Sequence, residues 1–268
     1  MDVLAQIDGW GASTVAATVV DADGGRAATH GPTDAVFRIA SVTKLLTTYA
    51  VLFAVEEGTV ALDEPAGPPG ATVRHLLAHA AGYGFTGPDP ITRPGRRRIY
   101  SNTGIEVLAA HVEAASGVPF ATYLADGVLT PLAMGSSTLH GSPAHRLHST
   151  VDDLARFAAE LFAPTLITAA TLAEATTVQF PGLAGKLPDI GRFDPLDWGL
   201  GFELRNHKQP HWTGAANSPA TYGHFGGSGC FLWVDPVAGR ALITLTDRDF
   251  GPWALTAWPA LSDAVLRF

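Results

Sequence analysis

The sequence predicts a mixed α/β (α+β) fold: an antiparallel sheet built from both chain ends and flanked by helices, with an inserted all-helical lobe. Strand-like patterns cluster near the two termini, and the segment between them is helical and rich in loops. We assign residues 1–58 and 195–268 to the α/β lobe and residues 59–194 to the helical lobe. With 268 residues, 47% of them hydrophobic, the chain is long enough for one such catalytic domain.

The N-terminal part predicts a β-hairpin, a short strand and a buried helix. Residues 15–21 and 26–30 flank an Asp-Gly-Gly turn, which is the pattern of a hairpin. Residues 37–40 form a third extended piece. Residues 41–57 are apolar almost all round and stop at Gly58, so they predict a central helix that is buried on every side.

The middle of the chain predicts five helices separated by loops. Gly117 ends one helix and Pro119 begins the next. Thr150 and Asp153 resemble a capping box with Asp in place of the usual Glu. Residues 82–98 form a long loop rich in Gly, Pro and Arg. The helices cover residues 72–80, 104–116, 119–129, 150–162 and 168–178.

Strand patterns return in the last third of the chain. They cover residues 198–204, 230–235 and 241–246, and the last two flank a turn at residues 236–239. A terminal helix over residues 252–268 closes the chain. These strands are the C-terminal half of the predicted sheet.

Composition excludes several classes of protein. The chain has 17 basic and 25 acidic residues and a net charge of −8, which argues against a nucleic-acid partner because phosphates need clustered cations. Only 16% of residues are charged, too few for a disordered chain. The first residues lack the basic and apolar regions of a secretory signal, and the longest near-apolar stretch, 45–55, is too short to span a bilayer. We therefore expect a cytoplasmic protein with no membrane partner, and a buried, inert thiol at Cys230.

Ser41 and Lys44 form an S-x-x-K pattern at the start of the predicted buried helix. The i,i+3 spacing places both side chains on one face, and a helix N-terminus favours a developing oxyanion at Ser41. A desolvated lysine has a lowered pKa and can accept the serine proton. Only three of the 17 basic residues are lysines, and this is the only S-x-x-K in the chain. The alternative is a lysine that extends to the surface from an apolar helix.

Tyr100, Ser101 and Asn102 follow the long loop and open a helix. The tyrosine can act as acid or base if a nearby cation lowers its pKa, and the asparagine amide can orient the lysine or a substrate carbonyl. The alternative is a buried tyrosine beside a helix cap.

A glycine-rich segment, residues 222–229, precedes an apolar strand. Glycines beside a strand let a ligand approach the backbone, and the N–H of Gly227 is a candidate oxyanion donor. The alternative is a glycine-rich turn. His75 and His79 are spaced i,i+4, but no H-e-x-x-H pattern or third ligand accompanies them, so we expect histidines satisfied within the fold.

In this order the pieces resemble the serine β-lactamase and penicillin-recognising superfamily, in its branch of class C β-lactamases, family VIII carboxylesterases and D-Ala-D-Ala peptidases. Residues 37–44 resemble that family's F-x-x-A-S-x-T-K motif, and residues 94–102 resemble P-G-x-x-x-x-Y-S-N. The likeness runs from about residue 37 to residue 246 and implies a β-lactamase/transpeptidase-like fold. Further matches are 58–65 with G-x-l-x-L-D-d-P, 76–82 with L-L-x-H-x-S-G, 198–202 with Y-G-L-G-W, and 224–227 at the third motif.

The chain departs from the family pattern at the third motif. Where K-T-G is common, this chain has His224, Phe225 and Gly226. The lysine of that motif attracts a substrate carboxylate, as in penicillins, whereas a histidine is mostly neutral at pH 7. The departure favours neutral esters or amides, and Ala81 in place of a serine is taken as structural.

The resemblance implies a hydrolase that works through an acyl-enzyme. Ser41 would attack a carbonyl, Lys44 and Tyr100 would share the base role, and the N–H groups of Ser41 and Gly227 would bind the oxyanion. We expect no metal and no organic cofactor. The expected partner is a small-molecule ester, β-lactam or short peptide, and we take the chain to be a monomer by default. The substrate-binding or orienting residues would be Asn102, His224 and Gly226.

Two alternatives remain at this stage. Within enzymes, a β-lactamase or a D-amino-acid peptidase competes with an esterase, and the missing export signal favours the ester or small-amide hydrolase. Outside enzymes, the same fold could be a catalytically silent module that binds a ligand. The absence of a G-x-S-x-G elbow argues against an α/β-hydrolase.

Overall fold

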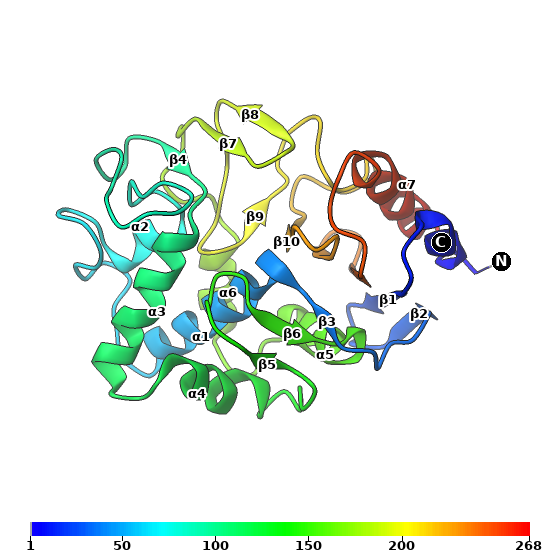
Figure 1. Ribbon diagram of the computed structural model, residues 1–268, viewed down its shortest axis with the longest axis horizontal. Coiled ribbons are helices and arrows are strands. Elements are labelled where there is room, and N and C mark those ends of the chain that lie inside the picture. Colours follow the sequence, from blue (N-terminus) through cyan, green and yellow to red (C-terminus); the bar gives the residue numbers. More distant parts are fainter. Residues whose placement is uncertain (1) are drawn as a thin grey trace.

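The computed structural model describes residues 2–268 and has the predicted mixed α/β architecture around a six-stranded antiparallel sheet (Figure 1). The order β2-β1-β12-β11-β10-β9 places the N-terminal hairpin beside the C-terminal strands, so both chain ends build the sheet. The register pairs Val15 with Thr246 and Asp21 with Arg240. The strands are β1 (Val15–Asp21), β2 (Arg26–His30), β9 (Glu203–Leu204), β10 (Tyr222–Phe225), β11 (Phe231–Asp235) and β12 (Arg240–Thr246).

Helices cover both faces of this sheet, because successive strand residues point to opposite sides. Ile243 on β12 belongs to the core shared with two helices, α1 and α5, whereas its neighbour Leu242 belongs to the core shared with α7. A 3-10 helix at Ala5–Trp10 joins the α7 side. The three helices are α1 (Thr43–Glu56), α5 (Val151–Phe162) and α7 (Ala254–Arg267).

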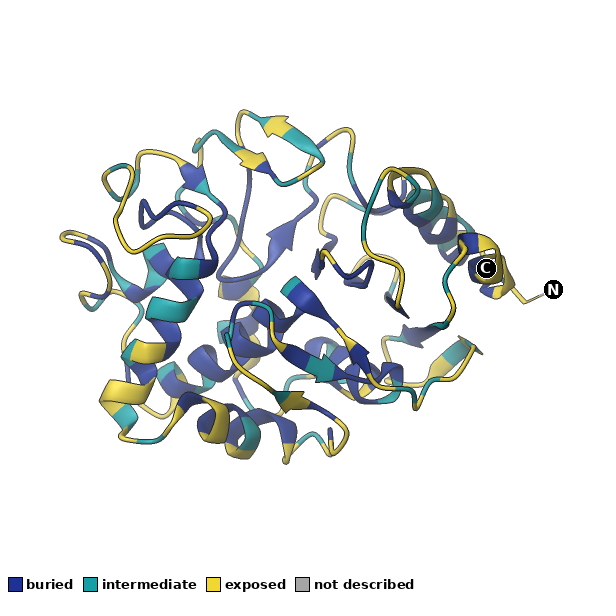
Figure 2. Ribbon diagram, viewed as in Figure 1, coloured by how far each residue is buried: buried dark blue, intermediate teal, exposed yellow. Residues whose placement is uncertain are grey.

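The helix α1 is buried on almost all sides, as its apolar pattern predicts. Figure 2 shows it as a largely dark-blue element inside the molecule. Lys44 is buried with the rest of the helix, so its position on an apolar helix does not reflect a side chain that extends to the surface.

The inserted region is not all-helical, which corrects the prediction. Besides short helices it holds five short strands, which form two small three-stranded sheets, one of them together with residues 37–38. Strands of two or three residues carry too little periodic pattern to be recognised. The helices are α2 (Val73–Leu77), α3 (Asn102–Ser116), α4 (Phe120–Leu124), a π-helix (Ala125–Leu129) and α6 (Ala169–Ala175). The sheets are β3 (Phe37–Arg38), β6 (Leu147–Ser149) and β5 (Thr138–Leu139), and β4 (Arg98–Ile99), β7 (Gly185–Leu187) and β8 (Gly191–Phe193).

Side chains cap the helices where the sequence indicates. The Thr150 hydroxyl accepts a hydrogen bond from Asp153 N and begins α5, but the Asp153 carboxylate accepts from Ser137 instead of returning to the cap. Gly117 ends α3 with a left-handed φ of 71°. Pro119 lies just before α4 rather than inside its first turn.

Two local predictions are wrong, and one strand was not predicted. Residues 222–225, the start of the glycine-rich segment, form strand β10, because glycine next to an aromatic residue hides the strand pattern. Only Glu203–Leu204 of the strand expected at 198–204 is present. Ser41 lies in a 3-10 turn, and α1 begins two residues later.

Two further points concern the whole chain and its cysteine. Of the helices in residues 2–268, none is long and apolar enough to cross a membrane. Cys230 is unpaired and buried, and burial raises its pKa to about 11, so it is the inert thiol that the sequence predicts.

Candidate active site

Ser41 and Lys44 lie side by side where the chain turns from β3 into α1. The Lys44 Nζ donates a hydrogen bond to Ser41 Oγ at 3.3 Å, so the i,i+3 spacing brings the two groups together as predicted. Ser41 is partly exposed, whereas Lys44 is fully buried. A substrate can therefore reach the hydroxyl while the amine stays out of water.

Three neutral acceptors hold the Lys44 amine in place. Nζ donates to Asn102 Oδ1 at 2.7 Å and to the Ala144 carbonyl at 2.9 Å, in addition to Ser41. Asn102 is the first residue of α3, and it orients Lys44 as the sequence predicts. The Ala144 carbonyl was not foreseen, because a backbone acceptor from a loop leaves no mark in the sequence.

Burial lowers the pKa of Lys44 to about 7, and the more distant carboxylate of Glu106 opposes the shift. No carboxylate of residues 2–268 forms an ion pair with the amine, so the neutral acceptors and the distant Glu106 offset only part of the cost of burying its charge. Near pH 7 a large fraction of Lys44 is therefore neutral and can accept a proton.

Tyr100 lies beside this pair, at the end of the loop that precedes α3. The Lys44 amine lies over the Tyr100 ring, 4.7 Å from the ring centroid. Burial raises the pKa of Tyr100, although the Ser41 hydroxyl lowers it slightly. The sequence suggests a tyrosine with a lowered pKa. Because Lys44 is itself largely neutral, that expectation is wrong, and Tyr100 is suited to donating a proton or a hydrogen bond.

Ser101 anchors the local backbone. Its hydroxyl caps α3 by accepting from Gly104 N at 2.9 Å and donates to the Gly84 carbonyl at 2.6 Å. The two bonds fix the chain between Tyr100 and Asn102, which places these two side chains on either side of the Lys44 amine.

Two amide groups are free to bind an oxyanion. Within residues 2–268, neither the N–H of Ser41 nor that of Gly227 donates a hydrogen bond. Gly226 packs so tightly against the turn that a Cβ added there would lie 3.0 Å from Ser41 N and 2.6 Å from the Ile39 carbonyl oxygen. Ala40, next to Ser41, holds a left-handed φ of 44°, a strained conformation typical of functional turns.

His224 is buried rather than lining an open pocket, which corrects the expectation for this residue. Its side chain is 3% exposed and packs against Tyr100 and Trp198. Nδ1 donates to the Phe225 carbonyl at 2.6 Å, and Nε2 has no partner among the described residues. Burial lowers the pKa of His224 to about 3, so the ring is neutral at pH 7 and gives the third motif no positive charge.

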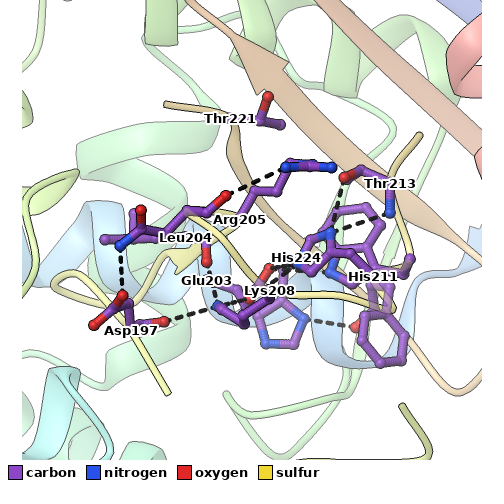
Figure 3. Close-up of polar contacts among 12 residues, drawn as sticks. Asp197, Glu203, Leu204, Arg205, Lys208, His211, Thr213, Thr221 and His224 are labelled. Atoms are coloured by element: carbon purple, nitrogen blue, oxygen red, sulfur yellow. Dashed lines mark hydrogen bonds and ion pairs between the residues drawn. The ribbon is translucent and has the colours of Figure 1, made fainter. Parts of the chain in front are cut away.

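A second buried lysine, Lys208, contacts β9 and was not foreseen (Figure 3). Lys208 forms an ion pair with Glu203, whose carboxylate also accepts from His211 at 3.0 Å and from Trp212 Nε1 at 3.0 Å. Burial alone would raise the pKa of Glu203, but Lys208 and His211 hold it below its ordinary value. Lys208 is also one of only three lysines in the chain, so the same scarcity that drew attention to Lys44 was the signal that could have identified it.

His75 and His79, the i,i+4 pair, do not converge on a metal, because no group of three or more His, Cys, Asp or Glu among residues 2–268 is placed to hold one. His79 is buried against Tyr100 and accepts from Ser101 N at 3.3 Å through Nδ1. His75 stacks on Phe180 at 4.2 Å and contacts Thr72. His75 has partners within the fold, as expected, but the buried Nε2 of His79 has no hydrogen-bond partner among the described residues, so the expectation holds only in part.

A cavity of about 770 Å³ adjoins the site at Tyr100. It lies between the long loop that precedes β4 and the β7–β8 hairpin, and Ser41 is outside its lining. Its walls include Phe85, whose ring stacks on Tyr100 at 5.9 Å. The cavity therefore offers space for the part of a substrate beyond the reacting group.

Comparisons with known proteins agree with this geometry. The family model described as Beta-lactamase matches residues 7–266. A D-alanyl-D-alanine-carboxypeptidase/endopeptidase, AmpH of Escherichia coli strain K12, is 28% identical over 50% of this chain and 47% of its own length. This chain thus spans about half the length of that curated relative.

Solved structures match over nearly the whole chain. A crystal structure of a beta-lactamase from Mycobacterium bovis is 54% identical, covers 99% of this chain and 98% of its own, and has a TM-score of 0.97. Simvastatin synthase (LovD) from Aspergillus terreus, at 16% identity, shares the fold with a TM-score of 0.83 over 98% of this chain and 95% of its own. On the family match and the near-complete structural likeness, the chain belongs to the beta-lactamase family, within the superfamily of beta-lactamase-like serine hydrolases.

Proposed function

We propose that the protein hydrolyses an ester or a small amide through an acyl-enzyme on Ser41. One observation carries the proposal: a fully buried lysine with a pKa near 7 donates a hydrogen bond to the hydroxyl of a partly exposed serine. A serine is a weak nucleophile until a neighbouring base removes its proton, and Lys44 is placed to do so.

In the first step, Ser41 Oγ attacks the substrate carbonyl while neutral Lys44 accepts its proton. The C–O bond to Ser41 forms, and the negative charge on the former carbonyl oxygen is stabilised by the free N–H groups of Ser41 and Gly227. Collapse of this intermediate breaks the bond to the leaving group. Tyr100, whose pKa is raised by burial, donates the proton to the departing oxygen or nitrogen and recovers one from Lys44.

In the second step, water attacks the acyl carbon by the same route. Neutral Lys44 accepts a proton from the water, the bond between the acyl carbon and Ser41 Oγ breaks, and Lys44 returns the proton to Ser41 Oγ. Asn102 keeps the Lys44 amine aimed at Ser41 in both steps through its 2.7 Å hydrogen bond. The residues supply every group that the reaction needs.

The neutral third motif supports an ester or amide that carries no carboxylate beside its reacting carbonyl. A buried, uncharged His224 offers no cation to such a carboxylate, which penicillins have. The likeness to AmpH keeps a D-amino-acid peptidase as the second candidate.

A fluorophosphonate probe is expected to label the protein once, on Ser41. Phosphonylation needs only an activated serine, so intact-mass spectrometry should show one adduct and peptide mapping should place it on the segment that holds Ser41. In parallel, short p-nitrophenyl esters are expected to be turned over faster than a chromogenic cephalosporin or a D-Ala-D-Ala peptide. An unmodified protein would instead favour a ligand-binding module.

Gly226→Ala is expected to lower ester hydrolysis about a hundredfold. The added Cβ would meet the Ile39 carbonyl oxygen at 2.6 Å, so the turn that carries Ser41 must shift, and misplacement by an ångström typically costs this much. Gly135→Ala is the matched control, because a Cβ there meets nothing within 4 Å and should leave kcat unchanged. Equal rates for the two variants would contradict the packing role of Gly226.

A further inference from the structure

Arg96 and Arg97 lie where the cavity beside Tyr100 meets a smaller cavity, and neither forms an ion pair among the described residues. The smaller cavity, about 320 Å³, is lined by Ile91, Thr92, Arg96, Arg97 and Ile99, and three of these also line the larger one. No carboxylate lines the smaller cavity. In a chain of net charge −8, this gives a local concentration of positive charge next to the proposed active site.

Arg98 is buried, and this places the preceding residues Arg96 and Arg97 on the exposed side of the loop. Arg98 donates to the carbonyl oxygens of Ala78 at 2.5 Å, Leu196 at 3.0 Å and Gln179 at 2.5 Å, which fixes this end of the loop. Arg97 precedes it on the exposed side of the chain. No ion pair joins Arg96 or Arg97 to a carboxylate of residues 2–268, so the fold does not use their charge.

An apolar passage connects these arginines to Tyr100. Phe85 is 54% exposed and Ile91 is 70% exposed, which is unusual for large apolar side chains, and both line the larger cavity. The Phe85 carbonyl accepts from Asn102 N at 2.9 Å, so the loop is tied to the residue that holds Lys44. The larger cavity, about 770 Å³, is within the range of small-molecule sites.

We propose that the substrate is an ester or amide with an apolar segment that ends in a carboxylate, which Arg96 and Arg97 bind at the far end of the cavity. The apolar segment lies against Phe85 and Ile91, and the reacting carbonyl lies at Ser41. A guanidinium binds a carboxylate through two parallel hydrogen bonds, which suits a terminal anion. This inference rests on the proposed function and adds its substrate class.

In the proposed substrate the carboxylate is at the end of the apolar segment, whereas in a penicillin it is close to the reacting carbonyl. His224, at the third motif, is neutral and buried, so an anion adjoining the reacting carbonyl gains nothing there. Lys186 and Arg192 add positive charge to the larger cavity, and the exposed carboxylates of Asp189 and Asp194 offset it. The end of the cavity at Arg96 and Arg97 therefore has a net attraction for a substrate carboxylate.

The test compares ester pairs that differ only in charge. In one pair, a p-nitrophenyl ester carries a carboxylate or a carboxamide at the end of a linear acyl chain. In the other, the carboxylate or carboxamide is on the phenol that leaves. The pair whose carboxylate lies on the side of the scissile bond that faces Arg96 and Arg97 is expected to show about a tenfold higher kcat/KM for the carboxylate, mostly through KM, and the advantage should shrink in 0.5 M salt.

Arg96→Gln and Arg97→Gln are each expected to reduce that advantage about three- to fivefold, the size of an exposed charge pair. Arg93→Gln is the matched control, because Arg93 is an exposed arginine of the same loop that lines neither cavity, and it should keep the full advantage. Equal turnover within both pairs, or an advantage that survives loss of both arginines, overturns the inference while Ser41-dependent hydrolysis stands. Loss of all ester turnover together with no labelling of Ser41 overturns the proposed function itself.

Discussion

Ser41→Ala is expected to lower kcat for p-nitrophenyl ester hydrolysis by about 10³- to 10⁶-fold, the largest effect of any single change in the chain. The covalent step needs the Oγ atom, and no other group at the site can replace it: Lys44 is fully buried and Tyr100 is 7% exposed. Residual turnover would come from the oxyanion donors alone. Initial rates under saturating substrate measure the effect.

Ser228→Ala is the matched control for this change. Ser228 is the other serine next to an oxyanion donor, but it is buried and its hydroxyl has no partner among the described residues. Its removal should change kcat by less than about threefold, because no base adjoins the hydroxyl. An Ser41→Ala protein that retained full activity and still reacted with the fluorophosphonate would place the nucleophile elsewhere.

The predictability of this molecule differs between its elements for physical reasons. The helix α1 and the hairpin of β1 and β2 were predicted because each has a strong period and a clear stop signal. In the two small sheets, residues 37–38 were expected to be extended, but the other five strands were not predicted, because strands of two or three residues leave no periodic pattern. Long periodic elements are therefore visible in the sequence, and short ones that only tertiary contacts stabilise are not.

In the candidate site, too, some features were predictable from the sequence and others were not. The i,i+3 spacing of Ser41 and Lys44 predicted their contact, and the contact forms although Ser41 lies in the 3-10 turn that leads into α1. The amide of Asn102 was foreseen as an orienting group through its place in a motif, and its 2.7 Å bond to Lys44 agrees. The raised pKa of Tyr100 and the burial of His224 were not foreseen, because both follow from how distant segments close over the ring.

Lys44→Met is expected to lower kcat by about 10²- to 10⁴-fold, the usual contribution of a general base. Methionine has a similar length and no proton-accepting group, so Ser41 would remain in place without activation. Since burial of an amine is costly, the variant should keep its fold, which a thermal melt checks. A rate within threefold of the parent would assign the base role to another group.

The pH dependence gives Lys44 a signature that a structural role would lack. Its pKa is lowered to about 7, and the neutral form is the active one, so log kcat/KM should rise with unit slope below pH 7 and level off above it. The inflection should be absent from the residual activity of Lys44→Met. A profile that instead fell as pH rose through 7 would mean that the charged amine is needed.

Glu106→Gln should move that inflection without removing it. The Glu106 carboxylate favours the charged form of Lys44 and so raises its pKa, although burial has the larger and opposite effect. Without this negative charge the pKa falls further, and the plateau of kcat/KM should begin at lower pH. Gln keeps the acceptor that Glu106 offers to the Ser142 hydroxyl at 2.5 Å, so the local structure is preserved. An inflection that did not move, or moved to higher pH, would show that the group titrating near pH 7 is not the buried amine beside Ser41.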